Sequence, residues 1–303
     1  MVWFRLLAVI TAAFAYLQIA LGGVVRVSGS GLGCPDWPLC HGRPYPPADI
    51  HAIIEYSHRA VGSVTGVLII ATVLSAWTVW RTRRPIVAWL ASASLIGVLG
   101  EGLLGAGVVA NDLASWLVLI HLGLAMIILG FLVATAVMAM PPRPSSGVPD
   151  PRLRRLAAIA TGATYLLLLS GSTVVASGAD AACRSWPLCG SGFTPDFAGM
   201  NAWTMLHRGS VLVIGALLAF VLVRTARQPG LRAVSIATLA LLALQVLVGA
   251  FAAVTDAATF NGLHVGLATL VWAGVLATAL LTVPRADRDA ELQSRVAMER
   301  RSA

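Results

Sequence analysis

The stretch Glu55-Tyr56-Ser57-His58-Arg59 has a counterpart, Thr204-Met205-Leu206-His207-Arg208, in the second half of the chain. Each stretch follows a loop with two cysteines: Cys34-Pro35-Asp36-Trp37-Pro38-Leu39-Cys40, and later Cys183-Arg184-Ser185-Trp186-Pro187-Leu188-Cys189. The cysteines, the tryptophan, the histidine and the arginine recur at an offset of 149 residues. Self-similarity at a fixed offset indicates a duplicated architecture. We therefore expect one site to be built twice, with a glutamate in only one copy.

The composition indicates a membrane protein. The 303 residues are 58% hydrophobic and 11% charged, with a mean hydropathy of +0.83, which is too apolar for a soluble domain. Apolar runs near twenty residues without two-residue alternation predict helices that cross ~30 Å of hydrocarbon. The sequence thus predicts an all-α polytopic membrane protein with eight transmembrane helices in two pseudo-symmetric four-helix bundles. The expected spans are 4–25, 58–80, 86–109, 115–138, 154–176, 204–223, 232–254 and 261–283.

The basic residues predict how the chain is oriented in a cell membrane. All 21 are arginine; 16 fall on one side of the expected spans and five on the other. The positive-inside rule then places both termini in the cytoplasm and both cysteine loops outside. Because the arginines cluster in short loops, the formal charge of +8 does not indicate nucleic-acid binding. We expect the first span to be retained, since it lacks a small-residue cleavage site and its counterpart lies mid-chain.

A proline- and arginine-rich stretch separates the two halves. We expect an N-terminal four-helix half, a cytoplasmic linker, a C-terminal four-helix half and a cytoplasmic tail. Because both halves have the same expected orientation, they are interpreted as parallel repeats related by an axis along the membrane normal. Their boundaries are 1–140, 141–153, 154–284 and 285–303.

Four histidines lie near the outer ends of the even-numbered spans. Ionisable groups in such positions are costly and usually functional. Two facing histidines on neighbouring helices can ligate a planar metal macrocycle from both sides. Zinc is a weaker alternative, because neither pair has the third and fourth ligands that a zinc site needs. The natural pairs are His58 with His121, and His207 with His264.

Two carboxylates are expected in the first half alone. Glu55 lies three residues before His58, so both face the same side of a helix. Such a carboxylate could move protons or stabilise a developing cation; alternatively, it is a helix N-terminal residue favoured by the macrodipole. Its counterpart, Thr204, cannot ionise. Glu101 is the other candidate, and its counterpart is Gln245.

Arg59 and Arg208 each follow a histidine at the outer interface. They could simply extend to lipid headgroups, or they could pair with the propionates of a neighbouring macrocycle. We favour the second interpretation because both arginines lie on the side that the positive-inside rule disfavours.

The cysteine pairs lie on the expected outer side, where oxidising conditions favour a disulfide within each loop. A redox-active disulfide is an alternative, because a short closed loop can be strained and reducible. Copper or zinc binding lacks nearby histidine ligands. His41 and His51 have no counterpart in the second half and are expected at the surface. The pairs are Cys34 with Cys40, and Cys183 with Cys189.

The run Gly31-Leu32-Gly33-Cys34-Pro35-Asp36-Trp37-Pro38-Leu39-Cys40-His41-Gly42, followed by Glu55-Tyr56-Ser57-His58-Arg59, resembles the haem A synthase family. The eight spans, the four histidines and the second cysteine pair resemble it too, from about residue 4 to residue 284. The resemblance implies conversion of haem O to haem A for cytochrome oxidase, by successive hydroxylation of the C8 methyl to a formyl. His58 and His121 would flank the substrate with Glu55 assisting, and His207 and His264 would ligate a haem b.

The second half departs from the fuller cysteine motif. Arg184 and Ser185 stand where the first half has Pro35 and Asp36. We therefore expect the second loop to be structural rather than redox-active. The partners implied by the resemblance are a haem O synthase and a quinone or other electron acceptor in the membrane.

Two other functions remain open from the sequence. A membrane thiol–disulfide oxidoreductase that reduces quinone would explain the cysteines but not the histidines. An electron-transfer cytochrome b, or a haem carrier, would explain the histidines but not Glu55. The sequence does not decide whether the chain forms homo-oligomers.

Overall fold

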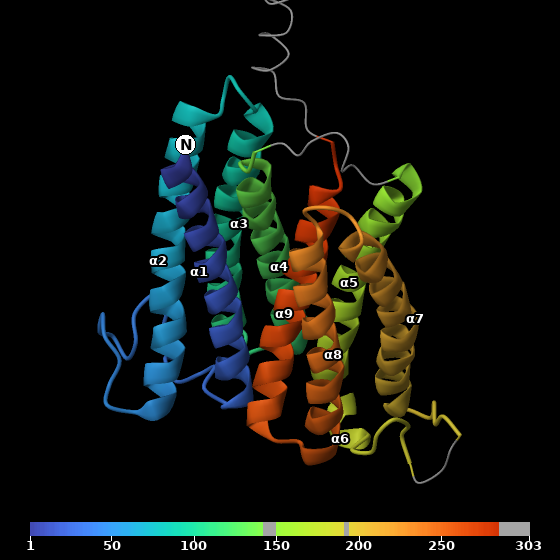
Figure 1. Ribbon diagram of the computed structural model, residues 1–303. Coiled ribbons are helices and arrows are strands. Elements are labelled where there is room, and N and C mark those ends of the chain that lie inside the picture. Colours follow the sequence, from blue (N-terminus) through green and yellow to red (C-terminus); the bar gives the residue numbers. More distant parts are fainter. Residues whose placement is uncertain (142–149, 191–193, 285–303) are drawn as a thin grey trace, which may run out of the picture.

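The computed structural model describes residues 1–141, 150–190 and 194–284, and within them every named element is a helix (Figure 1). Eight of the helices are long and apolar enough to cross a membrane. The prediction of an all-α polytopic membrane protein is therefore confirmed. The helices are α1 (Val2–Val27), α2 (Ile50–Val79), α3 (Pro85–Ala110), α4 (Ser115–Met138), α5 (Pro151–Ala176), the short α6 (Ala179–Ala182), α7 (Asn201–Ala226), α8 (Arg232–Thr255) and α9 (Ala258–Leu281).

The beginning of α2 is the one long-helix boundary that the apolar pattern misses by more than three residues. The helix begins at Ile50, eight residues before the expected span, because Asp49 caps it by accepting a hydrogen bond from the Ala52 amide at 3.0 Å. Glu55 and His58 consequently lie inside the helix. Glu55 is beyond the first turn, so the interpretation of this residue as a helix N-terminal carboxylate is wrong.

The helices of the two halves pack in the same order. In the first half α1 and α3 each contact both α2 and α4; in the second, α5 and α8 each contact both α7 and α9. Across the halves α1 contacts α9, α5 contacts α4, and α4 contacts α9. This arrangement is consistent with the expected pair of bundles.

The contact between halves is close. Trp272 of α9 packs on Gly130 of α4, where a Cβ would lie only 2.5 Å from the indole ring. About two helical turns nearer the start of α4, the Tyr165 hydroxyl of α5 donates a hydrogen bond to the Gly123 carbonyl of α4 at 3.1 Å. Small residues therefore let the helices approach, as is usual in membrane bundles.

The two ends of the helical bundle differ in the parts of the chain that lie there. The start of α1 and the end of α9 lie at one end, and the two cysteine loops lie at the other (Figure 1). At the first end Arg5 donates to the Ala139 carbonyl at 2.8 Å, and Arg84 donates to the Met138 and Met140 carbonyls at 3.2 and 3.3 Å. Of the expected linker, residues 142–149 lie outside the described part of the chain, as does the tail 285–303.

Candidate functional site

Each of the four histidines lies against a glycine of a neighbouring helix. The histidines of α2, α4, α7 and α9 are partly buried. Their imidazole rings lie against glycines of α1, α3, α5 and α8, where the absence of a side chain leaves room for the ring. A Cβ would press on the ring at three of these glycines, whereas at Gly105 it would lie at an ordinary contact distance. The distances from an ideal Cβ on the glycine to the histidine Cε1 are 3.1 Å for Gly22–His58, 3.4 Å for Gly105–His121, 2.9 Å for Gly171–His207 and 2.5 Å for Gly249–His264.

The same helices also supply each histidine with a polar neighbour. Three of these neighbours precede the glycine by four residues, which is about one helical turn. The fourth, Ser170, is adjacent to its glycine. The contacts are Gln18 Nε2 to His58 Nε2 (3.2 Å), Glu101 Oε1 to His121 Nδ1 (3.1 Å), Ser170 Oγ to His207 Nδ1 (2.8 Å) and Gln245 Nε2 to His264 Nε2 (3.4 Å). We call each glycine together with its polar neighbour an imidazole cradle.

The sequence did not predict Gln18, Ser170 or any of the four glycines as site residues. A signal was present for two cradles, because Glu101 and Gln245 recur at an offset of 144 residues, and so do Gly105 and Gly249. A polar residue followed by glycine one turn later, repeated on odd-numbered spans, would have predicted them.

The expected pairing of the histidines within each half is still a prediction. His58 and His121 lie close enough to interact electrostatically, and so do His207 and His264. Nδ1 of His58 and of His264 is buried without a hydrogen-bond partner, which is costly unless a ligand satisfies the ring. Within the described residues no three metal-ligating side chains cluster. Two imidazoles in each half are a donor set that would hold a planar metal macrocycle.

Glu55 and Arg59 attach the first cysteine loop to α2. Glu55 is only 3% exposed; its Oε2 accepts from the Cys34 amide at 2.7 Å, and its Oε1 forms an ion pair with Arg59. The Arg59 guanidinium also donates to the carbonyls of Cys34, Asp36 and Leu39 at 2.7, 2.6 and 2.7 Å. We call this pair the loop clamp. Charge-assisted bonds of this kind are about twice as strong as neutral ones.

The clamp accounts for Arg59 differently from the expected contact with a propionate. Its guanidinium binds the loop and Glu55 rather than facing away from them. In the second half Thr204 replaces Glu55 and donates to the Ala179 carbonyl at 3.1 Å. Among the described residues Arg208 makes one hydrogen bond, to the Pro187 carbonyl at 3.1 Å. A propionate contact is still a prediction for both arginines, and Arg208 retains more donors for it.

Both cysteine pairs form disulfides, as expected, Cys34 with Cys40 and Cys183 with Cys189. Within the first loop the Asp36 carboxylate accepts from the His41 and Gly42 amides at 2.6 and 2.7 Å. These bonds, the one from Gly42 foremost, hold the pKa of Asp36 below its usual value. At the equivalent position the Ser185 hydroxyl accepts from the Gly190 amide at 3.0 Å. Serine thus preserves the turn without the charge.

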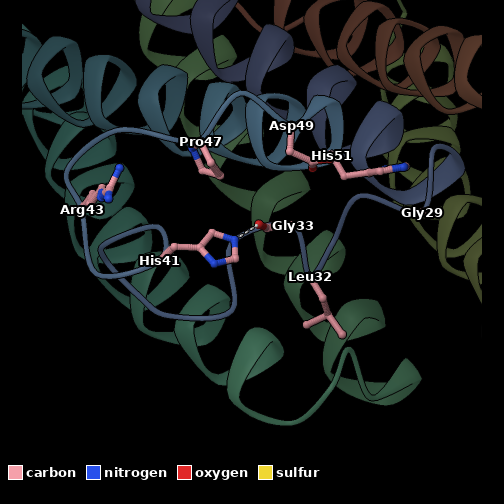
Figure 2. Close-up of a pocket in the computed structure, with 8 residues that line it drawn as sticks. All are labelled: Gly29, Leu32, Gly33, His41, Arg43, Pro47, Asp49 and His51. Atoms are coloured by element: carbon pink, nitrogen blue, oxygen red, sulfur yellow. Dashed lines mark hydrogen bonds between the residues drawn. The ribbon is translucent and has the colours of Figure 1, made fainter.

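A cavity of about 700 Å³ lies in the connection between α1 and α2, bordered by His41, Arg43, Asp49 and His51 among others (Figure 2). His41 contacts the Gly33 carbonyl through Nε2 at 3.0 Å. Both histidines are exposed, which confirms the expectation that they are surface residues. Because the cavity is formed by this connection, it is distinct from the cradles inside the bundle.

These features define a multi-pass membrane protein with two histidines in each half, near the end of the bundle that carries the disulfide-closed loops. A family model for cytochrome oxidase assembly proteins (COX15-CtaA) matches residues 5–276, and the chain belongs to this family. The chain is 30% identical over 290 residues to a heme A synthase of Alkalihalophilus pseudofirmus, covering 91% of this chain and 94% of the relative. It is 31% identical over 302 residues to a heme A synthase of Symbiobacterium thermophilum, covering 92% and 95%.

Proposed function

We propose that this chain is an oxidoreductase that converts haem O to haem A by oxidising the C8 methyl group to a formyl. The observation that carries the proposal is the pair of imidazoles in each half, set in cradles that leave ring nitrogens of His58 and His264 without a protein partner. Membership of the cytochrome oxidase assembly family and the names of the relatives support the same activity.

The two halves have different proposed roles. The N-terminal half holds the substrate between His58 and His121, because the carboxylates Glu55 and Glu101 occur in this half alone and their counterparts are Thr204 and Gln245. The C-terminal half holds haem b between its two histidines, with Arg208 near a propionate. A haem b in that site would supply one-electron transfer.

The residues of the first half then bind, orient and handle protons. His58 and His121 would hold the substrate from their cradles, and the loop clamp keeps the disulfide loop over the outer end of α2. Each hydroxylation with water as the oxygen source releases an electron pair and protons. Glu55 is our candidate for stabilising positive charge at the methyl or accepting a proton; to do so it must exchange its bond with the Cys34 amide. The electrons pass to a quinone or another acceptor in the membrane.

We further propose that the protein lies in the cell membrane with both termini cytoplasmic and both disulfide loops outside. The support is the arginine distribution, with 16 of 21 arginines on the proposed cytoplasmic side. A haem O synthase is the proposed supplier of substrate, since haem O is its product.

The first experiment is the identification of haems in the protein purified from cells that supply haem O. Pyridine haemochrome spectra and chromatography should show haem B together with haem O or haem A. Haem B alone, with no haem A formed, would instead favour an electron-transfer cytochrome. A protein without haem would favour the thiol–disulfide oxidoreductase.

A further inference from the structure

Glu101 is a carboxylate placed deep in the helical bundle. It lies nine residues before the outer end of α3, which is about 14 Å along a helix axis. Its side chain is 14% exposed, and its Oε2 is buried without a hydrogen-bond partner. An ionisable group at such a position is costly and calls for a specific role.

The neighbour of Glu101 is the imidazole of His121. Oε1 of Glu101 lies 3.1 Å from Nδ1 of His121. The two atoms are close enough for a hydrogen bond, but the ring is not aligned for one. The ring has room to turn into line, because a Cβ at Gly105 would still lie 3.4 Å from it, an ordinary contact distance. Contacts at functional sites commonly tighten when the ligand binds.

Comparison of the four cradles shows that this is the one whose polar neighbour is an ionisable carboxyl group. The polar neighbours of the other three histidines are the neutral side chains of Gln18, Ser170 and Gln245. Gln245 occupies the position of Glu101 in the repeat. At the same position of the repeat, one half therefore has an amide and the other has a carboxyl group. His121 is the one histidine of the four that has a carboxyl neighbour.

We propose that Glu101 is a positioning residue that accepts a hydrogen bond from Nδ1 of His121 and thereby directs Nε2 toward the iron of the substrate. An imidazole that is hydrogen-bonded to a carboxylate donates more electron density to a metal than one that is hydrogen-bonded to an amide. Stronger donation stabilises the oxidised iron, so the N-terminal centre has a lower reduction potential than it would with glutamine. Electrons then move more readily from the N-terminal to the C-terminal half. This inference rests on the proposed function, because it requires macrocycle binding by both histidine pairs.

The test is a potentiometric titration of the purified, haem-loaded protein, followed in the visible spectrum. Glu101→Gln should raise the midpoint potential of the N-terminal centre by about 59 mV, which is about a tenfold change in a one-electron equilibrium constant. Glu101→Asp should restore part of the difference, because it keeps the carboxylate. The exchange Gln245→Glu at the equivalent position, where the side chain contacts Nε2 of His264 rather than Nδ1, should lower the potential of the C-terminal centre.

Unchanged potentials in Glu101→Gln, with haem content equal to that of the wild type, would overturn the inference. If Glu101→Gln does not retain haem, Gln245→Glu decides: a lowered C-terminal potential supports the carboxylate effect, and an unchanged one refutes it. A wild-type protein that binds no haem would refute the proposed function itself, which is a separate result.

Discussion

At the scale of single residues, four glycines determine how closely each imidazole can approach the neighbouring helix. The approach is tightest at Gly249, where a Cβ would lie 2.5 Å from His264, and loosest at Gly105, where it would lie 3.4 Å from His121. The first distance is shorter than real Cβ contacts and the second is ordinary. The two positions are equivalent in the repeat, so they form a natural matched pair.

We therefore expect Gly249→Ala to displace His264 and to reduce the haem B content of the purified protein several-fold. Gly105→Ala should retain the haem of its half, because its methyl group fits against the ring. Quantified haem per protein chain, measured for both variants with helix content as the folding control, checks this difference. Equal haem retention in the two variants would contradict the cradle geometry.

Glu55 is the second single residue for which the structure supports a prediction, because its carboxylate is almost fully buried. His58 is held by Gln18 and Gly22 of α1, whereas Glu55 is held by the loop. We expect Glu55→Ala to keep bound haem near the wild-type amount while haem A formation stalls. Chromatography of extracted haems measures both quantities in one sample. A normal yield of haem A would remove Glu55 from the mechanism.

At the scale of structural elements, the sequence predicts most of the architecture and little of the clamp. The apolar spans predict seven of the eight long helices to within three residues because burial in lipid depends on length and hydropathy alone. The early start of α2 depends on Asp49, a capping signal outside the apolar run. The partners of Arg59 depend on how the loop folds back on α2, which no periodicity encodes. The repeat offset nevertheless identified His58, His207 and both cysteine pairs, and the position near the ends of the even-numbered spans identified His121 and His264.

Because of the clamp, the first disulfide loop is attached to its helix by more contacts than the second. Arg59 donates to three loop carbonyls and pairs with Glu55, whereas Arg208 contacts one carbonyl of its loop among the described residues. Arg59→Ala leaves the Glu55 carboxylate without its cation and frees the loop, so we expect its disulfide to be reduced several-fold faster. Arg208→Ala is the matched control and should change the second disulfide little.

The measurement is thiol labelling of intact membranes over time after addition of an impermeant reductant, with each loop resolved by mass. If Arg59→Ala and the wild type expose the Cys34 and Cys40 thiols at the same rate, the clamp does not hold the loop. The same variant also separates two explanations for Glu55: stalled oxidation in both Arg59→Ala and Glu55→Ala implicates loop position, and stalled oxidation in Glu55→Ala alone implicates the carboxylate.

At the scale of the whole molecule, the two halves are joined by helix contacts as well as by the chain. α1, α4, α5 and α9 form the contact, with Trp272 seated on Gly130 and Tyr165 bonded to the Gly123 carbonyl. In a membrane such close packing and interhelical hydrogen bonds provide the association energy, since lipid removes the hydrophobic drive. The proposed transfer of electrons between the halves requires that this contact persist.

Dividing the chain between residues 142 and 149 tests whether packing suffices. We expect the two halves, produced together in one membrane, to co-purify through a tag on either half and to retain haem. Tyr165→Phe should weaken co-purification only slightly, because an interhelical hydrogen bond is worth ~0.6 kcal/mol in a membrane. Gly130→Leu should abolish it, because even a Cβ there lies 2.5 Å from the Trp272 ring. Separate purification of the unmodified halves would show that the connecting chain, rather than the packed helices, keeps the two sites together.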